Sequence, residues 1–249
     1  MESYYKLSKS AITFNGKCLD EEIKGYMTLN VIGRQMFAPK LESQEIRGRD
    51  GDITTSLSYP ARDIEVQYYL QAENNREWLQ KMKKLTMLLQ SKEDVEYSFA
   101  DEYGVRFGRL SGFEDPPYDW NAGIGKFTIH SQDPFLYSEL REDTNKIKEL
   151  RYDYYPVKIE SISLMVGVAG NKLVLRNAET GNRIIVNDDF KAGDKIVFRD
   201  KKIFKNNKNV LAKLDYVASD FFDFDLYSGH SLSCNLASQI KIEYREKVL

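Results

Sequence analysis

Residues 60–90 read PARDIEVQYYLQAENNREWLQKMKKLTMLLQ, and this stretch predicts a strand followed by a helix. Its first part, Ile64-Glu65-Val66-Gln67-Tyr68, alternates apolar and polar residues, which is typical of a strand with one packed and one solvated face. Its second part carries one apolar stripe at helical spacing, made of Trp78, Met82, Leu85 and Leu89. Asn74 is expected to cap the helix, paired with Glu77 in the manner of a capping box. The stretch therefore predicts an amphipathic helix, over about 75–90, that packs on a sheet.

Two turn signals precede this stretch. Residues 12–17 read ITFNGK, a β-rich run that enters an Asn-Gly turn. Residues 46–51 read IRGRDG, where Gly48 and Gly51 can adopt positive φ and the Asp-Gly pair predicts the tip of a hairpin. The chain before residue 60 is therefore expected to consist of short strands joined by tight turns.

Further strands and a linker follow the helix. Short strands are expected near 95–99, 103–110 and 125–130. A charged stretch over 139–149 then interrupts the pattern and is typical of a linker between domains. We therefore expect an N-terminal domain over 1–138 and a C-terminal domain over 139–249.

The second domain is predicted to be all β. Turns at regular intervals separate short strands near 173–175, 183–186, 195–198 and 202–204, a pattern typical of a β-sandwich. The run that ends at Asp225 alternates Phe and Asp, which predicts a half-exposed strand with Phe222 and Phe224 on one face. The closing stretch 240–249 is also strand-like, and the sequence leaves open whether it returns to the first domain. The fold class is thus mainly β (α+β), with a β-sandwich-like first domain that carries one helix.

The composition argues against nucleic-acid-binding and membrane proteins. The chain has 36 basic and 38 acidic side chains and a net charge of −2, so it lacks the basic excess usual in nucleic-acid-binding proteins. Met1 to Lys6 contain no apolar core of a signal peptide, and no apolar run approaches the ~20 residues of a membrane helix. We therefore expect synthesis in a cytoplasm, with no membrane partner and no sequence-specific nucleic-acid partner. Cys18 and Cys234 are expected as buried or half-buried thiols.

The residues with reactive side chains form no pattern that predicts chemistry. A zinc site needs paired Cys and His ligands, but the four-residue spacing of His230 and Cys234 has no second pair. The serine after His230 lacks the glycines of a nucleophile elbow. Residues 123–126 read GIGK and lack the remainder of a phosphate loop. We therefore expect no enzyme activity, no cofactor and no metal.

The order of several short motifs resembles a known family. The motifs are ITFNGK at 12–17, VIGR at 31–34, IRGRDG at 46–51, PARDIEV at 60–66, FADE at 99–102 and DPF at 133–135. In this order, with the predicted helix before FADE, the chain is similar to the distal tail protein (Dit) family of long-tailed phages with non-contractile tails. The likeness is good over about residues 12–137 and weaker in the second half.

The resemblance implies a structural role in the virion. Members of that family form a hexameric ring at the end of the tail tube, through which DNA can pass. Their N-terminal domains close the ring and join the tail-tube protein to the tail-associated hub protein. Their C-terminal domain is a galectin-like β-sandwich, which in some members anchors receptor-binding or baseplate proteins. For this chain the resemblance implies a place at the virion tail tip, after assembly in the host cytoplasm.

Five charged residues are candidates for the contact between subunits: Arg47, Arg49 and Asp50 in the predicted hairpin tip, and Arg62 and Asp63 beside Pro60. Charges of both signs on a rigid turn suit a contact that sets register between copies, and a solvated turn accounts for them equally well. A closed ring needs two unlike surfaces on each copy.

The alternative function is a carbohydrate-binding module that contacts host cell-wall glycan. The two tryptophans that would be expected to stack on sugar, Trp78 and Trp120, both fall in the first domain. The second domain also lacks a large insertion that could hold an added module. These features favour the structural role over carbohydrate binding.

Overall fold

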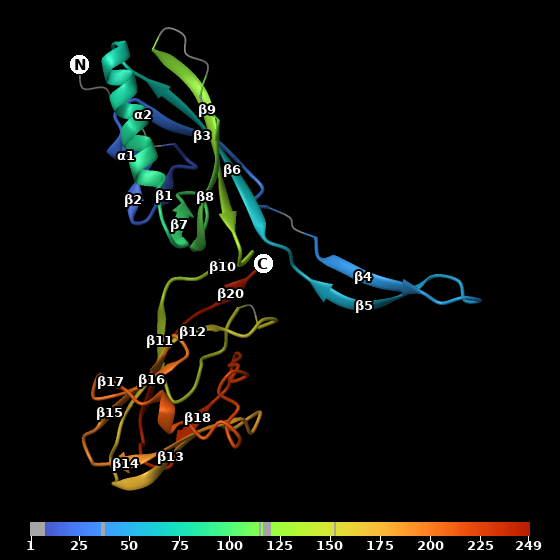
Figure 1. The fold of residues 1–249 in the computed structure, drawn as a ribbon, viewed down its shortest axis with the longest axis vertical. Coiled ribbons are helices and arrows are strands. Elements are labelled where there is room, and N and C mark those ends of the chain that lie inside the picture. The colour runs from blue at the N-terminus through green and yellow to red at the C-terminus, as the bar shows by residue number, and fades with distance from the viewer. Residues whose placement is uncertain (1–7, 36–37, 115, 117–120, 152) are drawn as a thin grey trace. The chain divides into compact units, whose positions relative to one another are not determined.

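The chain is described by a computed structural model that covers residues 8–35, 38–114, 116, 121–151 and 153–249 (Figure 1). The N-terminal stretch Met1 to Lys6 and Trp120, both used in the sequence predictions, lie outside the described residues. The chain divides into two compact units, Met1–Leu136 with Leu249, and Tyr137–Val248. Both units are built mainly from strands, which confirms the predicted fold class.

Unit 1 is a seven-stranded antiparallel sheet with a helix on one face. The strand order is β2-β1-β7-β8-β9-β6-β3. The bounds are β1 (Ile12–Phe14), β2 (Lys17–Cys18), β3 (Tyr26–Ile32), β6 (Arg62–Gln71), β7 (Val95–Phe99), β8 (Arg106–Glu114) and β9 (Ala122–Ser131). The predicted strand at Ile64 to Tyr68 is the middle of β6, and its alternation holds, since Ile64, Val66 and Tyr68 are fully buried.

The predicted helix is α2 (Asn75–Leu89), which Figure 1 shows lying along the sheet. The Asn74 side chain accepts a hydrogen bond from the Glu77 N–H at 3.0 Å, and the Glu77 carboxylate accepts one from the Glu73 N–H at 2.7 Å. These two bonds satisfy backbone donors that the first turn leaves free. Trp78, Leu85 and Leu89 are buried in the core of unit 1, so the predicted stripe is the packed face. A four-residue helix, α1 (Leu19–Glu22), precedes β3.

Unit 2 contains a six-stranded sheet and a three-stranded sheet, with its hydrophobic core formed by buried residues of both. The six-stranded sheet has the order β11-β19-β12-β15-β16-β17. Its strands are β11 (Arg141–Thr144), β12 (Lys158–Met165), β15 (Lys195–Arg199), β16 (Lys202–Lys205), β17 (Lys208–Asn209) and β19 (Ile240–Arg245). The smaller sheet contains β13 (Gly170–Asn177), β14 (Arg183–Phe190) and β18 (Leu232–Cys234).

The closing strand pairs inside unit 2. β19 lies between β11 and β12. The short strands β10 (Leu136–Tyr137) and β20 (Lys247–Val248) pair with each other. One 3₁₀ turn, η1 (Leu211–Lys213), follows β17. Cys18 and Cys234 are half-buried free thiols, as predicted.

The predicted strand before Asp225 is wrong. The chain there forms turns, and the two phenylalanines differ, since Phe222 is exposed and Phe224 is buried. Two hydrogen bonds join the start of this loop to β14: the Asp220 N–H donates to the Arg183 carbonyl at 2.8 Å, and the Asp220 carboxylate accepts from the Arg183 N–H at 3.0 Å. The Asp220 side chain therefore takes the place that a backbone carbonyl would have in a strand pair.

Candidate assembly surface

The most exposed element of unit 1 is a two-stranded hairpin, called the arm here, made of β4 (Lys40–Glu45) and β5 (Asp52–Ser58). Figure 1 shows it extending away from the sheet beyond the start of β6. Every residue from 40 to 58 is exposed. An isolated two-stranded hairpin is marginally stable in water, because it has no face against which to bury side chains. An element of this kind is typical of a surface that is completed by a partner.

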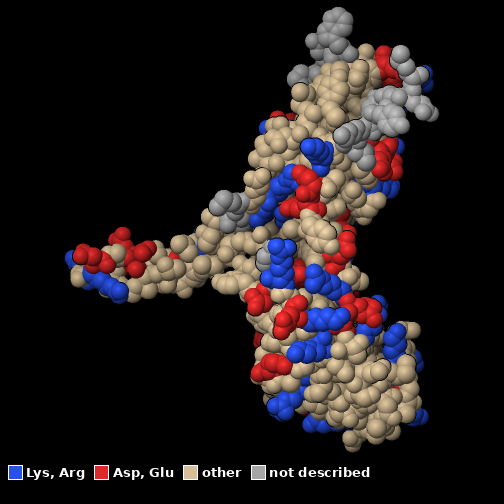
Figure 2. Space-filling view, turned by 180° about the vertical axis from the view of Figure 1, so that it is seen from behind, with Lys and Arg blue, Asp and Glu red and all other residues tan. Residues whose placement is uncertain are grey.

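The tip of the arm is the hairpin turn that the sequence predicts. The Arg49 N–H donates to the Ile46 carbonyl at 3.1 Å, and Gly48 and Gly51 have φ of 85° and 81°. The candidate residues Arg47, Arg49 and Asp50 lie in this turn, and Figure 2 shows charges of both signs gathered at the end of the arm. The structure therefore brings three of the five candidates together on one exposed turn.

The shaft of the arm carries apolar side chains that are exposed in the described part of the chain. Leu41 and Leu57 face each other across the two strands, and each is 57% exposed. Ile46 and Ile53, nearer the tip, are also exposed. A β-bulge at Glu42 interrupts the pairing, and a bulge increases the local twist of a ribbon. Leu41 and Leu57 thus form an exposed apolar pair, and exposed apolar side chains that lie together on a protein surface commonly mark a site of protein contact.

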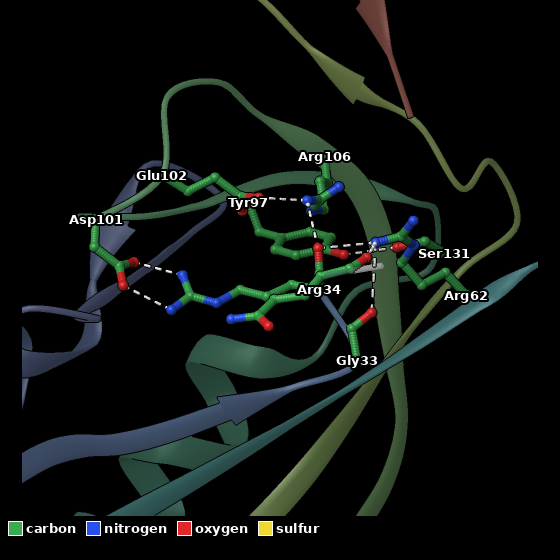
Figure 3. Close-up of polar contacts among 9 residues, drawn as sticks. Gly33, Arg34, Arg62, Tyr97, Asp101, Glu102, Arg106 and Ser131 are labelled. Carbon is green, nitrogen blue, oxygen red and sulfur yellow. Dashed lines mark hydrogen bonds and ion pairs between the residues drawn. The ribbon is translucent and has the colours of Figure 1, made fainter. Parts of the chain in front are cut away.

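Arg62 holds the base of the arm. It is the first residue of β6, and only 2% of it is exposed. Its Nη1 lies 3.0 Å from the Arg34 carbonyl, 3.3 Å from the Gln35 carbonyl and 3.5 Å from the Gly33 carbonyl (Figure 3). These carbonyls belong to the segment that leaves β3 towards the arm. One guanidinium therefore fixes the outgoing chain to the returning one.

Two ion pairs surround this contact. Arg34 bonds both carboxylate oxygens of Asp101, at 2.5 and 2.6 Å, and its guanidinium lies 5.1 Å from the centre of the Phe99 ring. Arg106 is buried, and its Nη2 lies 2.5 Å from Glu102 and 3.4 Å from the Arg34 carbonyl. We call this group the arm-base cluster; its members are Gly33, Arg34, Arg62, Asp101, Glu102 and Arg106 (Figure 3).

The ionisation of the arm-base cluster favours a fixed structure. The hydrogen bonds from Arg34 hold the pKa of the Asp101 carboxyl below its ordinary value of 3.8, so the pair stays charged down to acidic pH. Burial, and next the nearby positive charge of Arg106, lower the pKa of Arg62. Beneath the cluster the buried Tyr97 hydroxyl shares a 2.7 Å hydrogen bond with Ser131, and burial raises the pKa of Tyr97 to about 12. The Asp101 carboxyl is therefore ionised and the Tyr97 hydroxyl neutral at neutral pH.

Asp63 follows Arg62 in sequence but lies on the other side of β6. Its side chain is 67% exposed and lies 2.7 Å from His130 Nδ1 on β9. Adjacent residues of a strand point to opposite faces, which separates these two candidates. The other members of the arm-base cluster could not be found from the sequence, because Arg34 meets Asp101 and Arg106 only in the folded unit, across segments far apart in the chain.

Three remaining sequence predictions concern a metal site, the surroundings of His230 and a membrane helix. In it, no group of three or more His, Cys, Asp or Glu residues is placed to hold a metal ion. His230 Nδ1 lies 3.0 Å from the side-chain amide of the buried Asn177, a contact that orients the imidazole. No helix in the described ranges is long and apolar enough to cross a membrane.

Two family models match most of the chain between them. The model of the phage tail protein RIFT-related domain matches residues 23–130, and the model of the siphovirus-type tail component, C-terminal domain, matches residues 157–247. A curated relative, the distal tail protein of Bacillus phage SPP1, is 28% identical over 116 residues. That alignment spans 45% of this chain and 45% of the relative, so the matched part is less than half of each protein.

Solved structures show the same fold over nearly the whole chain. The crystal structure of the SPP1 Dit protein, described as a paradigm of the hub adsorption apparatus in phages that infect Gram-positive bacteria, superposes with a TM-score of 0.76 and 18% identity. It covers 96% of this chain and 99% of that one. A chain of the phage p2 baseplate in its activated conformation matches with a TM-score of 0.57 and 14% identity, over 90% of this chain and 91% of the other. These structures show the fold; the two domain matches and the curated relative show that the chain belongs to the distal tail protein (Dit) family of siphophages.

Proposed function

We propose that copies of this chain form a closed hexameric ring at the distal end of a long non-contractile phage tail. The ring connects the tail-tube protein to the tail-associated hub protein, and unit 2 is available to hold receptor-binding or baseplate proteins. The role is structural and needs no catalysis, cofactor or metal. The observation that carries the proposal is the arm, a wholly exposed hairpin whose base is fixed by buried arginine contacts.

A ring requires a second surface that differs from the arm, because head-to-tail contacts join unlike patches. The outer face of the unit 1 sheet provides one. Met27 pairs with Tyr69, and Tyr69 pairs with Ile124, so three side chains form a row across β3, β6 and β9. Met27 is 41% and Ile124 58% exposed. The arm of one copy and this row on the next give each subunit two apolar patches that can be buried in the same contact.

The proposal is tested by imaging assemblies of the full chain. The purified protein is mixed with its tail-tube and hub proteins, and the particles are examined by negative-stain electron microscopy and sedimentation. We expect rings with sixfold symmetry and a central opening. The chain alone is a weaker test, because a ring component can remain monomeric until its neighbours are present. Single copies in every mixture, at micromolar concentration and across salt conditions, would contradict the proposal.

A further inference from the structure

The outer face of the six-stranded sheet in unit 2 is hollowed into a groove of about 370 Å³, within the range of small-ligand sites. The inner face of this sheet packs its buried residues into the core of unit 2. The groove runs over β12, which is a central strand of the sheet. A second hollow shares Ser163, Lys195 and Lys241 with it, so the depression continues along the face. Its extent suits a chain-like ligand.

The groove arises from small residues placed between large ones. Ser161 and Ser163 are the outward-facing residues on the middle of β12. On one side Ser163 faces Lys241 and Ser161 faces Glu243, both on β19. On the other side Ser163 faces Val197, and Lys195 and Arg199 lie along the same strand, β15. Two hydroxyls therefore form the floor, and long charged side chains form the walls.

The carboxylates of the groove are already paired. Glu243 lies 2.9 Å from the Lys241 ammonium and accepts a 2.7 Å hydrogen bond from the Ser161 hydroxyl. These contacts lower the pKa of Glu243, so it is ionised and satisfied at neutral pH. Glu160 lies 3.4 Å from the Lys158 ammonium. The negative charges of Glu243 and Glu160 are thus balanced by neighbouring lysines.

Two cationic residues of the groove, Lys195 and Arg199, form no ion pair with a described carboxylate. Among the described residues, no carboxylate lies within 4 Å of the side-chain nitrogens of Lys195 or Arg199, and both residues are exposed. The Arg199 guanidinium lies 5.0 Å from the centre of the Phe204 ring, a cation–π contact that holds it at the groove wall. The groove therefore presents the exposed Lys195 ammonium and the Arg199 guanidinium beside hydroxyl groups and an aromatic ring.

We propose that this groove binds an anionic glycan, a saccharide or polyol chain that carries carboxylate or phosphate groups. Lys195 and Arg199 match the negative groups, the floor serines and the Asn207 amide match hydroxyls, and the Phe204 ring matches the apolar face of a sugar. An extended peptide fits less well, because a peptide strand adds to a free sheet edge and β12 is paired on both sides. This inference concerns unit 2 and does not depend on ring formation.

The test measures binding to the full-length protein by isothermal titration calorimetry. The probes are an oligogalacturonate, which carries carboxylates, and a glycerol phosphate polymer, with neutral dextran and single-stranded DNA of matched length as comparisons. We expect saturable binding of at least one of the two anionic probes, and which of them binds identifies the anionic group. Replacing Lys195 and Arg199 by glutamate should raise the Kd for that probe about tenfold or more, the effect of losing charge-assisted contacts.

Two further variants make the result specific. Ser163→Phe fills the floor without changing the charge and should also weaken binding, while circular dichroism confirms that the fold is kept. Lys172→Glu with Lys191→Glu changes two exposed lysines outside the groove and should leave the Kd unchanged. No saturable binding of either anionic probe, equal weakening by the control pair, or equally tight binding of DNA would overturn the inference.

Discussion

Replacing Arg62 by alanine is expected to lower the free energy of unfolding by about 2–4 kcal/mol, as measured by urea denaturation at neutral pH. The Arg62 side chain is almost completely buried, and its Nη1 lies within hydrogen-bonding distance of the carbonyls of Gly33, Arg34 and Gln35. Alanine removes this donor and leaves a cavity beside the buried Arg106. Lysine at this position should recover only part of the loss, because an ammonium is more strongly hydrated than a guanidinium and costs more to bury.

Arg109 provides the matched control, since it lies on β8 of the same sheet and pairs with Asp94 at 2.6 Å. Its side chain is 40% exposed, so Arg109→Ala should cost less than about 1 kcal/mol, as is usual for surface ion pairs. If the two alanine variants lose the same stability, Arg62 does not hold the base of the arm in the way described.

Replacing Leu41 and Leu57 by serine is expected to leave the unfolding curve unchanged and to weaken ring assembly about a hundredfold or more. The two leucines face each other on the arm and contribute little to the fold of a single copy, because more than half of each is exposed. In the proposed ring both become buried, and burying a leucine side chain contributes about 1.5–3 kcal/mol. Sedimentation velocity with the tail-tube and hub proteins present measures the change in assembly.

The control for this variant is Val168→Ser with Val217→Ser, which removes two exposed apolar side chains of unit 2. This control should assemble as the unchanged protein does. A leucine variant that forms rings at the same concentration as the unchanged protein would exclude the arm shaft from the contact.

The local features of unit 1 follow directly from its sequence. Alternation over Ile64 to Tyr68 predicts the buried and exposed sides of β6, because one face of that strand packs against the core. The Asn74 and Glu77 pair predicts the start of α2, because the bonds involved span only a few residues. The glycines at 48 and 51 predict the tip of the arm for the same reason.

Features that depend on distant pairing could not be predicted in this way. The burial of Arg62 depends on carbonyls that lie about 28 positions earlier in the chain. Arg34 and Asp101 are 67 residues apart, and they meet although β3 and β7, the strands before them, are not neighbours in the sheet. The incorrect prediction of a strand at Phe222 has the same cause, since that loop is bonded to Arg183 on β14, which lies far earlier in the chain.

In the proposed function the arm acts through contact with other proteins, which requires no catalytic residues. The arm can expose its side chains without loosening unit 1, because buried arginines of the arm-base cluster bond the backbone at its base. In the proposed ring, Arg47, Arg49 and Asp50 set the register of the contact, while Leu41 and Leu57 add apolar area to it. This division between charged tip and apolar shaft is common in specific protein interfaces.

The most direct measurement places a photoreactive amino acid at Arg49 and maps its crosslinks in the assembled particle by mass spectrometry. Copies labelled with heavy nitrogen are mixed with unlabelled copies, so that links between two copies are distinguished from links within one. The account predicts links from the arm tip of one copy to a second copy of the chain. Crosslinks confined to the same copy, in particles that have assembled normally, would contradict it.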